Sequence, residues 1–161
     1  MSAEIERKWL VDRVPPEVEG GRWATRKLEQ GYLAVTPDVE VRVRRADGAD
    51  AWLTVKSSPA LARVEEELVL EDGAFERLWP LTEGRRLVKH RYSREADRGV
   101  LLELDVYDGT LDGLAVLEVE FASEEAAGAF VAPDWVGREV TGDRAYANQT
   151  LALEGLPASS S

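Results

Sequence analysis

The sequence predicts a mainly β domain of the α+β class: an eight-stranded antiparallel closed β-barrel, or tunnel, with a charged interior and a few helices packed outside. Eight segments alternate polar and apolar residues with the two-residue period of a β-strand. Turn residues separate these segments. On several of the later strands the polar positions carry charges of one sign, which a sheet face in contact with solvent does not require.

Turn motifs separate several of the predicted strands. Thr36-Pro37-Asp38, Ala46-Asp47-Gly48, Ser58-Pro59 and Asp108-Gly109 combine residues that favour tight turns. Because these connections are short, neighbouring strands are expected to pair antiparallel. The eight predicted strands are residues 3–11, 28–35, 39–46, 51–57, 62–70, 87–94, 99–107 and 115–121.

Helices are predicted at residues 73–81, 124–131 and 144–154. The second follows Ser123 and the third follows Asp143, and both residue types are good N-caps. Residues 12–23 contain two prolines and two glycines, which predicts a loop or a broken short helix. No linker divides the chain, so residues 1–155 are expected to form one domain and residues 156–161 a disordered tail.

Composition narrows the class of function. A chain of 161 residues with 44% hydrophobic residues can bury one core, and its net charge of −11 disfavours nucleic-acid and anionic-membrane partners. The absence of cysteine excludes disulfides and thiolate zinc sites, and the single histidine excludes multi-histidine metal sites. No apolar run reaches the roughly 18 residues of a membrane span. A cytoplasmic monomer or homodimer is therefore predicted.

The charged positions on successive strands differ in sign. One such stripe is most simply a solvated sheet face, but its recurrence on at least six strands favours one shared inward surface. Because buried unpaired charges cost several kcal/mol each, this surface should enclose water or a charged ligand. The basic members are Lys8, Arg42, Arg44, Lys56, Lys89 and Arg91, and the acidic members are Glu4, Glu6, Glu65, Glu67, Glu103, Asp105, Glu118 and Glu120.

Both signs together indicate the ligand. Guanidinium and ammonium groups match the oxygens of a phosphate chain. Clustered carboxylates would repel that chain unless Mg²⁺ or Mn²⁺ lay between the two sets of oxygens. The predicted ligand is a small metal-chelated polyphosphate. Trp52 shares the face of Lys56, which leaves two interpretations of this indole: packing, or contact with a nucleoside or thiamine ring.

The ordered set of charged pairs resembles the CYTH superfamily of triphosphate tunnel metalloenzymes. The set runs from Glu4-x-Glu6-x-Lys8 through Arg42-x-Arg44, Lys56, Glu65-x-Glu67, Lys89-x-Arg91, Glu103-x-Asp105 and Glu118-x-Glu120 to the segment 140–148. The likeness covers almost the whole chain, and its compact length is similar to the short bacterial inorganic triphosphatases. It implies an eight-stranded tunnel and metal-dependent hydrolysis of the terminal phosphoanhydride, most simply of inorganic triphosphate. Alternatives are an activity like that of class IV adenylyl cyclases or thiamine triphosphatases, or a non-catalytic phosphate-binding module.

The resemblance also implies roles for individual residues. Glu4 and Glu6 would orient the attacking water, and Lys8 would stabilise developing charge or assist proton transfer. Metal binding falls to Glu4, Glu6, Glu118 and Glu120, and phosphate binding to Lys8, Arg42, Arg44, Lys56, Lys89 and Arg91. Glu65, Glu67, Glu103 and Asp105 are implied as further acids of the tunnel.

Overall fold

A computed structural model describes residues 5–58 and 64–158 of the chain. Eight strands form one sheet in the order β1-β8-β7-β6-β2-β3-β4-β5, and every neighbouring pair is antiparallel. This confirms the predicted fold class. The strands are β1 (Ile5–Leu10), β2 (Ala24–Val35), β3 (Val39–Ala46), β4 (Asp50–Ser57), β5 (Glu65–Val69), β6 (Arg86–Ala96), β7 (Val100–Tyr107) and β8 (Ala115–Phe121).

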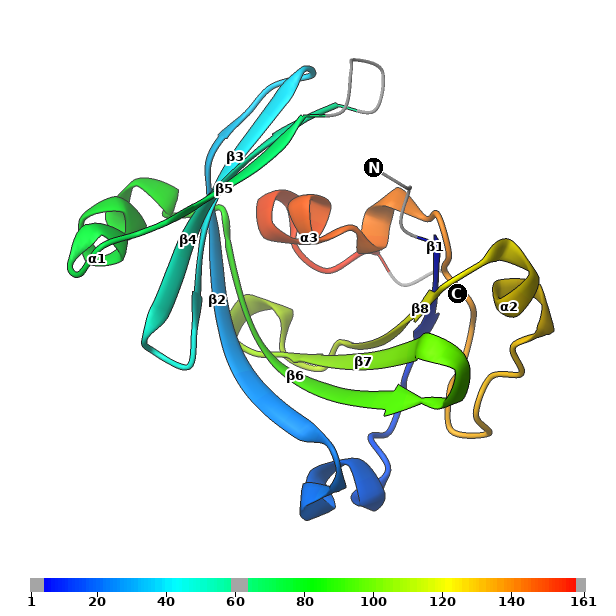
Figure 1. The fold of residues 1–161 in the computed structure, drawn as a ribbon. Helices are drawn as coiled ribbons and strands as arrows, with labels where there is room; N and C mark the ends of the chain where they lie inside the picture. The colour runs from blue at the N-terminus through cyan, green and yellow to red at the C-terminus, as the bar shows by residue number, and fades with distance from the viewer. Residues whose placement is uncertain (1–4, 59–63, 159–161) are drawn as a thin grey trace.

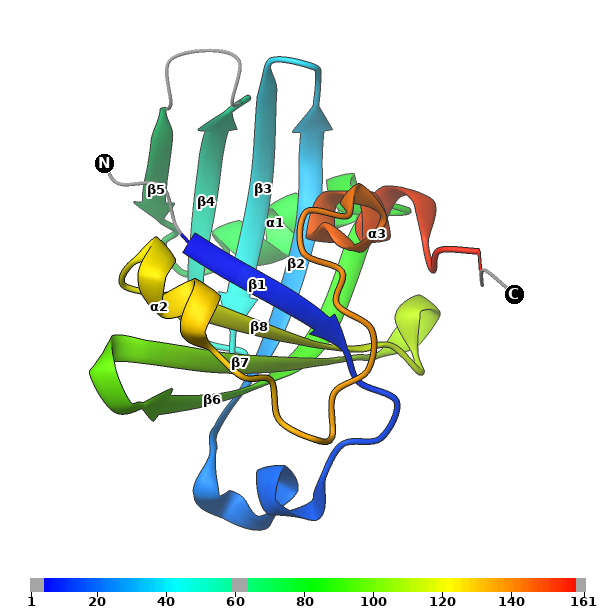
Figure 2. The ribbon, with the colours of Figure 1, turned by 90° about the vertical axis from the view of Figure 1, so that its right-hand side faces the viewer.

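The sheet is strongly curved, and α3 lies on the inner side of its curve (Figure 1). Arg42, Arg44, Arg91 and Glu103 line a cavity on this inner side, which is called the hollow below. Within the described ranges its hydrogen-bonded ladder runs from β1 to β5 without joining these two strands. The outer edge of β1 pairs instead with residues 137–141: Leu10 exchanges backbone hydrogen bonds with Gly137 and Arg138, and the Val140 N–H donates to the Lys8 carbonyl. Figure 2 shows this C-terminal segment running beside β1. The tunnel wall is therefore completed on this side by irregular chain.

Short helices cover the sheet. α1 (Ala74–Leu78) continues as the 3₁₀ turn η2 (Trp79–Thr82), α2 (Glu124–Ala129) starts at the predicted Ser123 cap, and α3 (Asn148–Glu154) ends at Gly155. The predicted helix over 144–154 is interrupted, because Ala147 is extended between the 3₁₀ turn η5 (Arg144–Tyr146) and α3. The remaining single turns are η1 (Val18–Arg22), broken at Gly21 as residues 12–23 suggest, η3 (Asp97–Gly99) and η4 (Gly109–Leu111).

The apolar residues form three clusters, two of them outside the curled sheet. Trp9, Leu104 and Leu117 belong to the cluster that packs with Ala127 of α2, and Val43 belongs to the cluster that packs with Phe75 of α1. This agrees with the expectation that the apolar faces of the strands point outward. The third cluster was not foreseen. It contains Tyr32, Leu87, Tyr107 and Val116, which share the inner face with the charged residues and pack against Leu151 of α3. Apolar packing therefore fills one end of the hollow.

Of the helices in the described part of the chain, none is long and apolar enough to cross a membrane. The predicted tail begins with residues 156–158, which are irregular, whereas residues 159–161 lie outside the described ranges.

Gly31 provides a test of the packing between β2 and η2. A Cβ atom at this position would lie 2.5 Å from Thr82 Oγ1. Thr82 is fully buried, donates to the Trp79 carbonyl at 2.7 Å and accepts from Arg86 Nε at 2.9 Å, so it has no freedom to move. We expect Gly31→Ala to lower the free energy of unfolding by about 1–3 kcal/mol in urea titrations.

The matched control for this substitution is Gly128→Ala. A Cβ atom there meets no described atom within 4 Å and the backbone is helical, so the unfolding free energy should stay the same or rise by up to about 1 kcal/mol. Equal effects of the two substitutions would show that Thr82 is not held as described.

Candidate active site

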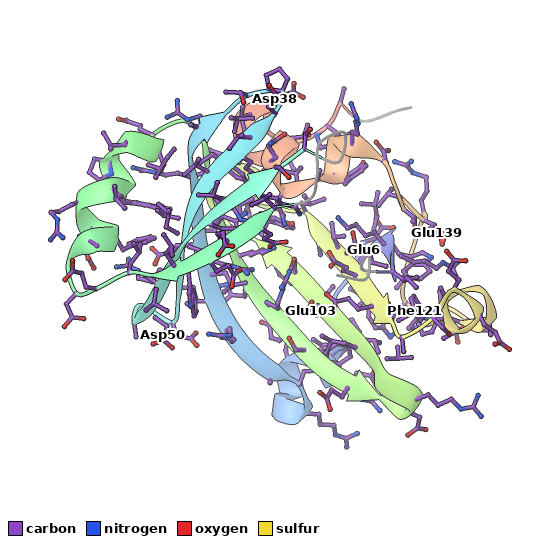
Figure 3. All side chains as sticks on the ribbon, turned by 45° about the horizontal axis from the view of Figure 1, so that its top comes forward. Glu6, Asp38, Asp50, Glu103, Phe121 and Glu139 are labelled. Carbon is purple, nitrogen blue, oxygen red and sulfur yellow. The ribbon has the colours of Figure 1, made fainter. Side chains whose placement is uncertain are left out.

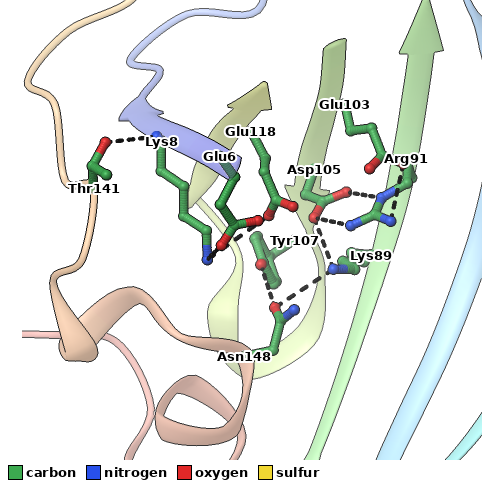
Figure 4. Close-up of polar contacts among 10 residues, drawn as sticks. All are labelled: Glu6, Lys8, Lys89, Arg91, Glu103, Asp105, Tyr107, Glu118, Thr141 and Asn148. Carbon is green, nitrogen blue, oxygen red and sulfur yellow. Dashed lines mark hydrogen bonds and ion pairs between the residues drawn. The ribbon is translucent and has the colours of Figure 1, made fainter. Parts of the chain in front are cut away.

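The register of the strands places charged residues of three neighbouring strands in one row on the inner face, and Ser93 of β6 continues this row. Lys8 of β1 lies opposite Glu118 of β8, Glu118 lies opposite Glu103 of β7, and Glu103 lies opposite Ser93 of β6. Paired residues on neighbouring strands point to the same face of a sheet. The alternation in the sequence therefore places these side chains on one face; Figure 3 labels Glu103 on the inner side of the curved sheet, and Figure 4 shows it with Lys8 and Glu118.

Asp105 lies at the centre of an ion-pair network (Figure 4). Its carboxylate accepts from Lys89 Nζ at 2.7 Å and from Arg91 Nε and Nη2 at 2.8 and 3.0 Å. The third guanidinium nitrogen of Arg91, Nη1, lies 3.1 Å from Glu103. Burial alone would raise the pKa of Asp105, but the adjoining Lys89 and Arg91 charges lower it to about 2. Asp105 is thus ionised and pairs with the side chains of Lys89 and Arg91, so it holds these two basic residues in place.

Lys89 is fully buried, and burial lowers its pKa to about 8 although Asp105 opposes this effect. Its ammonium group also donates to Asn148 Oδ1 at 3.5 Å, and this oxygen accepts from the Tyr107 hydroxyl at 2.8 Å. Asn148 is the first residue of α3, so the C-terminal helix fixes the orientation of a basic residue in the site.

The lowered pKa of Lys89 predicts a pH dependence of stability. Between pH 8 and the ordinary lysine value of 10.5, the unfolded chain binds more protons than the folded chain, so stability rises with pH through this window. Urea unfolding at pH 7.5, 8.5 and 9.5 should show an increase of up to about 1.4 kcal/mol per pH unit. The highest pH of this series, 9.5, lies below the ordinary tyrosine pKa of 10.0, above which burial raises the pKa of Tyr32 and Tyr107.

Lys89→Met is the comparison for this experiment. The substitution leaves Asp105 bound by Arg91, and it should remove the rise in stability above pH 8. Parallel profiles for the variant and the original protein would contradict a buried lysine of lowered pKa.

Three carboxylates form the candidate metal-binding group. One oxygen each from Glu103, Glu118 and Glu120 lies within 4.8 Å of the others. Lys8 Nζ lies 3.8 Å from both Glu118 and Glu6, which places the lysine at the edge of this group. Of the predicted metal ligands, Glu118 and Glu120 thus lie together. Glu6, on β1, lies opposite Glu120, and Glu4 falls outside the described residues. Glu103 joins the group from the set of further acids.

Arg42 and Arg44 face the hollow from β3. Arg42 pairs with Glu40 at 3.2 Å, whereas no ion pair of Arg44 occurs within residues 5–58 and 64–158. Burial, followed by the nearby charges of Arg91 and Arg42, lowers the pKa of Arg44. The Nε atoms of Arg42 and Arg44 are buried without a hydrogen-bond partner in the described part of the protein. Unsatisfied buried donors of this kind favour binding of an anion.

Two cavities meet at Arg42. The smaller has a volume of about 280 Å³ and the larger about 560 Å³. The smaller is lined by Arg26, Leu28, Arg42, Arg44, Trp52, Thr54, Glu67, Arg91, Ser93 and Glu103. Residues of the larger include Lys8, Tyr32, Glu40, Arg42, Lys56, Arg144, Asn148 and Gln149.

The predicted site residues of β4 and β5 lie at the periphery. Lys56 is exposed and lies opposite Glu40 on one side and Glu65 on the other. Glu65 and Glu67 are exposed on the edge strand β5. Glu67 nevertheless lines the smaller cavity and Lys56 the larger one, so both border the space beside the buried network around Asp105.

Sequence reasoning did not assign roles to Asn148, Gln149 and Tyr107. Gln149 Nε2 donates to Glu40 at 3.0 Å, so both leading residues of α3 contact the basic half of the site. Alternation from Asp105 is a signal that places Tyr107 on the inner face, but no local pattern shows that a C-terminal helix enters the hollow.

A curled antiparallel sheet that gathers carboxylates and arginines agrees with the comparisons with known proteins. The family model described as "CYTH domain" matches residues 2–145. The chain belongs to the CYTH family. This CYTH chain is 47% identical over 151 residues to an inorganic triphosphatase of Nitrosomonas europaea, and the aligned residues cover 93% of this chain and 97% of the relative. It is 37% identical over 155 residues to an inorganic triphosphatase of Acetivibrio thermocellus, with 94% of each chain covered.

Solved structures give the same result for the fold of the CYTH chain. The crystal structure of the inorganic triphosphatase NE1496 superposes with a TM-score of 0.78 at 44% identity and covers 98% of this chain and 99% of that one. A protein from Hippeastrum described as a putative adenylyl cyclase with dominant triphosphatase activity has a TM-score of 0.54 at 16% identity, covers 78% of this chain and 83% of that one, and is similar in fold alone.

Proposed function

We propose that this chain hydrolyses inorganic triphosphate to pyrophosphate and phosphate in the presence of Mg²⁺ or Mn²⁺. The observation that carries the proposal is that one hollow holds three adjacent carboxylates and two arginines, Arg42 and Arg44. The buried Nε atoms of these arginines lack hydrogen-bond partners among the described residues. The similarity to inorganic triphosphatases over nearly the whole chain supports it.

The carboxylate group fits a hard divalent cation. Glu103, Glu118 and Glu120 offer oxygen atoms within 4.8 Å of one another, and carboxylate oxygens are the ligands that Mg²⁺ and Mn²⁺ prefer. These residues would hold the ion, with Glu6 on the neighbouring strand beside them. The chemistry that the ion supplies when bound is neutralisation of charge on the phosphate oxygens.

The basic residues would align the substrate. Arg44 and Arg42 bring guanidinium forks to the phosphate oxygens, and Arg91 is held in place by Asp105. Phosphoryl transfer through a loose transition state needs mainly alignment and charge neutralisation, so no covalent nucleophile is required. In the reaction the oxygen of water bonds to a terminal phosphorus, the bond from that phosphorus to the bridging oxygen breaks, and the water loses a proton to solvent.

Glu6 and Lys8 complete the proposed mechanism. Glu6, on β1, would orient the water, and Lys8 would stabilise the charge that develops on the bridging oxygen. The position of Lys8 Nζ, 3.8 Å from both Glu6 and Glu118, supports this assignment.

The test is the release of phosphate from inorganic triphosphate with Mg²⁺ or Mn²⁺, followed by addition of a chelator. We expect turnover that the chelator abolishes and that added metal restores. Metal-independent binding without turnover would identify a phosphate-binding module instead. Conversion of ATP to cyclic AMP and pyrophosphate would identify a cyclase.

Three further predictions concern the setting of the enzyme: a cytoplasmic location, no nucleic-acid or membrane partner, and a monomeric or homodimeric state. Light scattering of the purified protein tests the last of these.

A further inference from the structure

We infer that Thr141 is a positioning residue of the proposed triphosphatase: its hydroxyl group holds the backbone of Lys8 and thereby sets the place of the Lys8 ammonium group beside Glu118. The inference rests on the proposed function, in which Lys8 stabilises the charge that develops on the bridging oxygen. Thr141 belongs to the irregular segment 137–141 beside β1, and not to the strands that carry the charged residues.

The segment 137–141 binds the outer edge of β1, the end strand of the hydrogen-bonded sheet. At Leu10 both hydrogen bonds to this segment join backbone groups, at 2.9 and 2.7 Å. At Lys8 a side chain takes part. The Val140 N–H donates to the Lys8 carbonyl at 2.8 Å, whereas the Lys8 N–H donates to the Thr141 hydroxyl oxygen at 3.0 Å (Figure 4).

A turn explains why a side chain takes the place of the backbone acceptor at Lys8. In a regular antiparallel pair the Val140 carbonyl would accept from the Lys8 N–H, but here it accepts from the Asp143 N–H at 3.0 Å. This bond closes a tight turn in which Gly142 has a φ of 74°, a left-handed conformation that favours glycine. Thr141, inside the turn, therefore supplies the acceptor that backbone pairing does not provide.

The same turn directs the chain toward the site. It leads into η5 and α3, where Asn148 accepts from Lys89 Nζ at 3.5 Å. Lys8 and Asn148 line the larger cavity together with Arg144. The turn thus joins β1 to the chain that carries Asn148, and the Thr141 hydroxyl is the side-chain link between them.

The backbone of Lys8 matters because its ammonium group is not held by short contacts. Lys8 Nζ lies 3.8 Å from both Glu6 and Glu118, which is longer than a hydrogen bond. These two carboxylates attract the ammonium group without fixing its place. A displacement of about 1 Å can lower a rate by roughly 100-fold, so a hydrogen bond that holds the backbone of Lys8 affects turnover.

The experiment compares Thr141→Val with Thr141→Ser. Valine has the shape of threonine without the hydroxyl group, so kcat for inorganic triphosphate should fall about tenfold, whereas KM should change less than about threefold because Lys8 acts in the transition state. Serine keeps the acceptor oxygen and should keep kcat within about twofold. Thr141 is exposed, so both variants should unfold within about 0.5 M urea of the original protein.

The matched control is Glu139→Gln in the same segment. Glu139 pairs with Arg7, which alternates with Lys8 and points to the other face of β1, so its substitution should leave kcat within about twofold. A second comparison shows whether Thr141 acts through Lys8. In a Lys8→Met protein, Thr141→Val should lower kcat by less than about twofold, whereas a merely structural role would give the same tenfold loss as in the original protein.

Hydrogen exchange of the Lys8 amide tests the bond without turnover. This amide should exchange at least about tenfold more slowly in the original protein and in Thr141→Ser than in Thr141→Val. If Thr141→Val does not fold, or Lys8→Met has no measurable turnover, the protection of the Lys8 amide in the original protein and in Thr141→Ser decides.

Three results overturn the inference: equal kcat for Thr141→Val and Thr141→Ser, the same loss from Thr141→Val with and without Lys8, or an unprotected Lys8 amide in the original protein. Each of them leaves the proposed function standing as long as the original protein hydrolyses inorganic triphosphate. Failure of the original protein to hydrolyse it would overturn the proposed function, and this inference with it.

Discussion

Glu118→Gln is expected to lower kcat for inorganic triphosphate by at least about 100-fold, the usual scale for removing one charged group that stabilises a transition state. Glu118 is the middle residue of the row that links Lys8 to Glu103, and it contributes one of the three clustered carboxylates. The amide has the size of the carboxylate but no charge, so it weakens the metal group and leaves Lys8 with Glu6 alone. Initial rates over a range of Mg²⁺ and Mn²⁺ concentrations measure the effect.

The matched control is Glu66→Gln on the outer face of β5. Glu66 is exposed and alternates with the inward-pointing Glu65 and Glu67, so its removal should leave kcat within about twofold. A Glu118→Gln enzyme with normal turnover at low metal concentration would exclude the clustered carboxylates from the reaction.

Arg44→Met is expected to raise KM and lower kcat together, with a combined loss in kcat/KM of about 100-fold or more. Arg44 is the guanidinium in the hollow whose charge has no carboxylate partner among the described residues, so a phosphate oxygen is the group that best satisfies its buried Nε. Arg44→Lys keeps the charge but loses the planar fork, and should recover only part of the activity.

The same substitution should stabilise the substrate-free protein. Burial and the charges of Arg91 and Arg42 lower the pKa of Arg44, which means that the folded state disfavours its positive charge. A methionine removes this cost, so the urea midpoint should rise while activity falls. Arg94→Met, at an exposed outward position of β6, is the control and should change neither quantity. A loss of stability together with activity in Arg44→Met would point to a structural role instead.

Most of the fold follows from the sequence, because the side-chain period of a strand is local information. All eight predicted strands occur, and only their ends move; β2, for example, starts at Ala24 instead of Leu28. Residues 3, 4, 62 and 63 of the predicted strands lie outside the described residues. The break in the last predicted helix at Ala147 depends on tertiary contacts. Asn148 turns its side chain to Tyr107 and Lys89 within the hollow, and no helix-propensity argument contains these partners.

The face on which the charged side chains of the site lie could likewise be predicted from the sequence. Alternation correctly places Lys89, Arg91, Asp105 and Glu118 on one face, since strand register keeps paired residues together. Alternation does not rank the members of a face. It cannot show that Asp105 pairs with both Lys89 and Arg91 whereas Glu103 lies beside Glu118. The different partners of the two acids depend on the distances between side chains on neighbouring strands.

The position of β1 has a consequence for the synthesis of the protein. Its described backbone partners are β8 and residues 137–141, so this strand is held by segments that the ribosome makes much later than the strand itself. Pairing across this separation is slow and must wait until the residues of β8 have been made. Lys8 is fixed only at that point, and nascent chains that end before residue 115 should therefore hold no triphosphate.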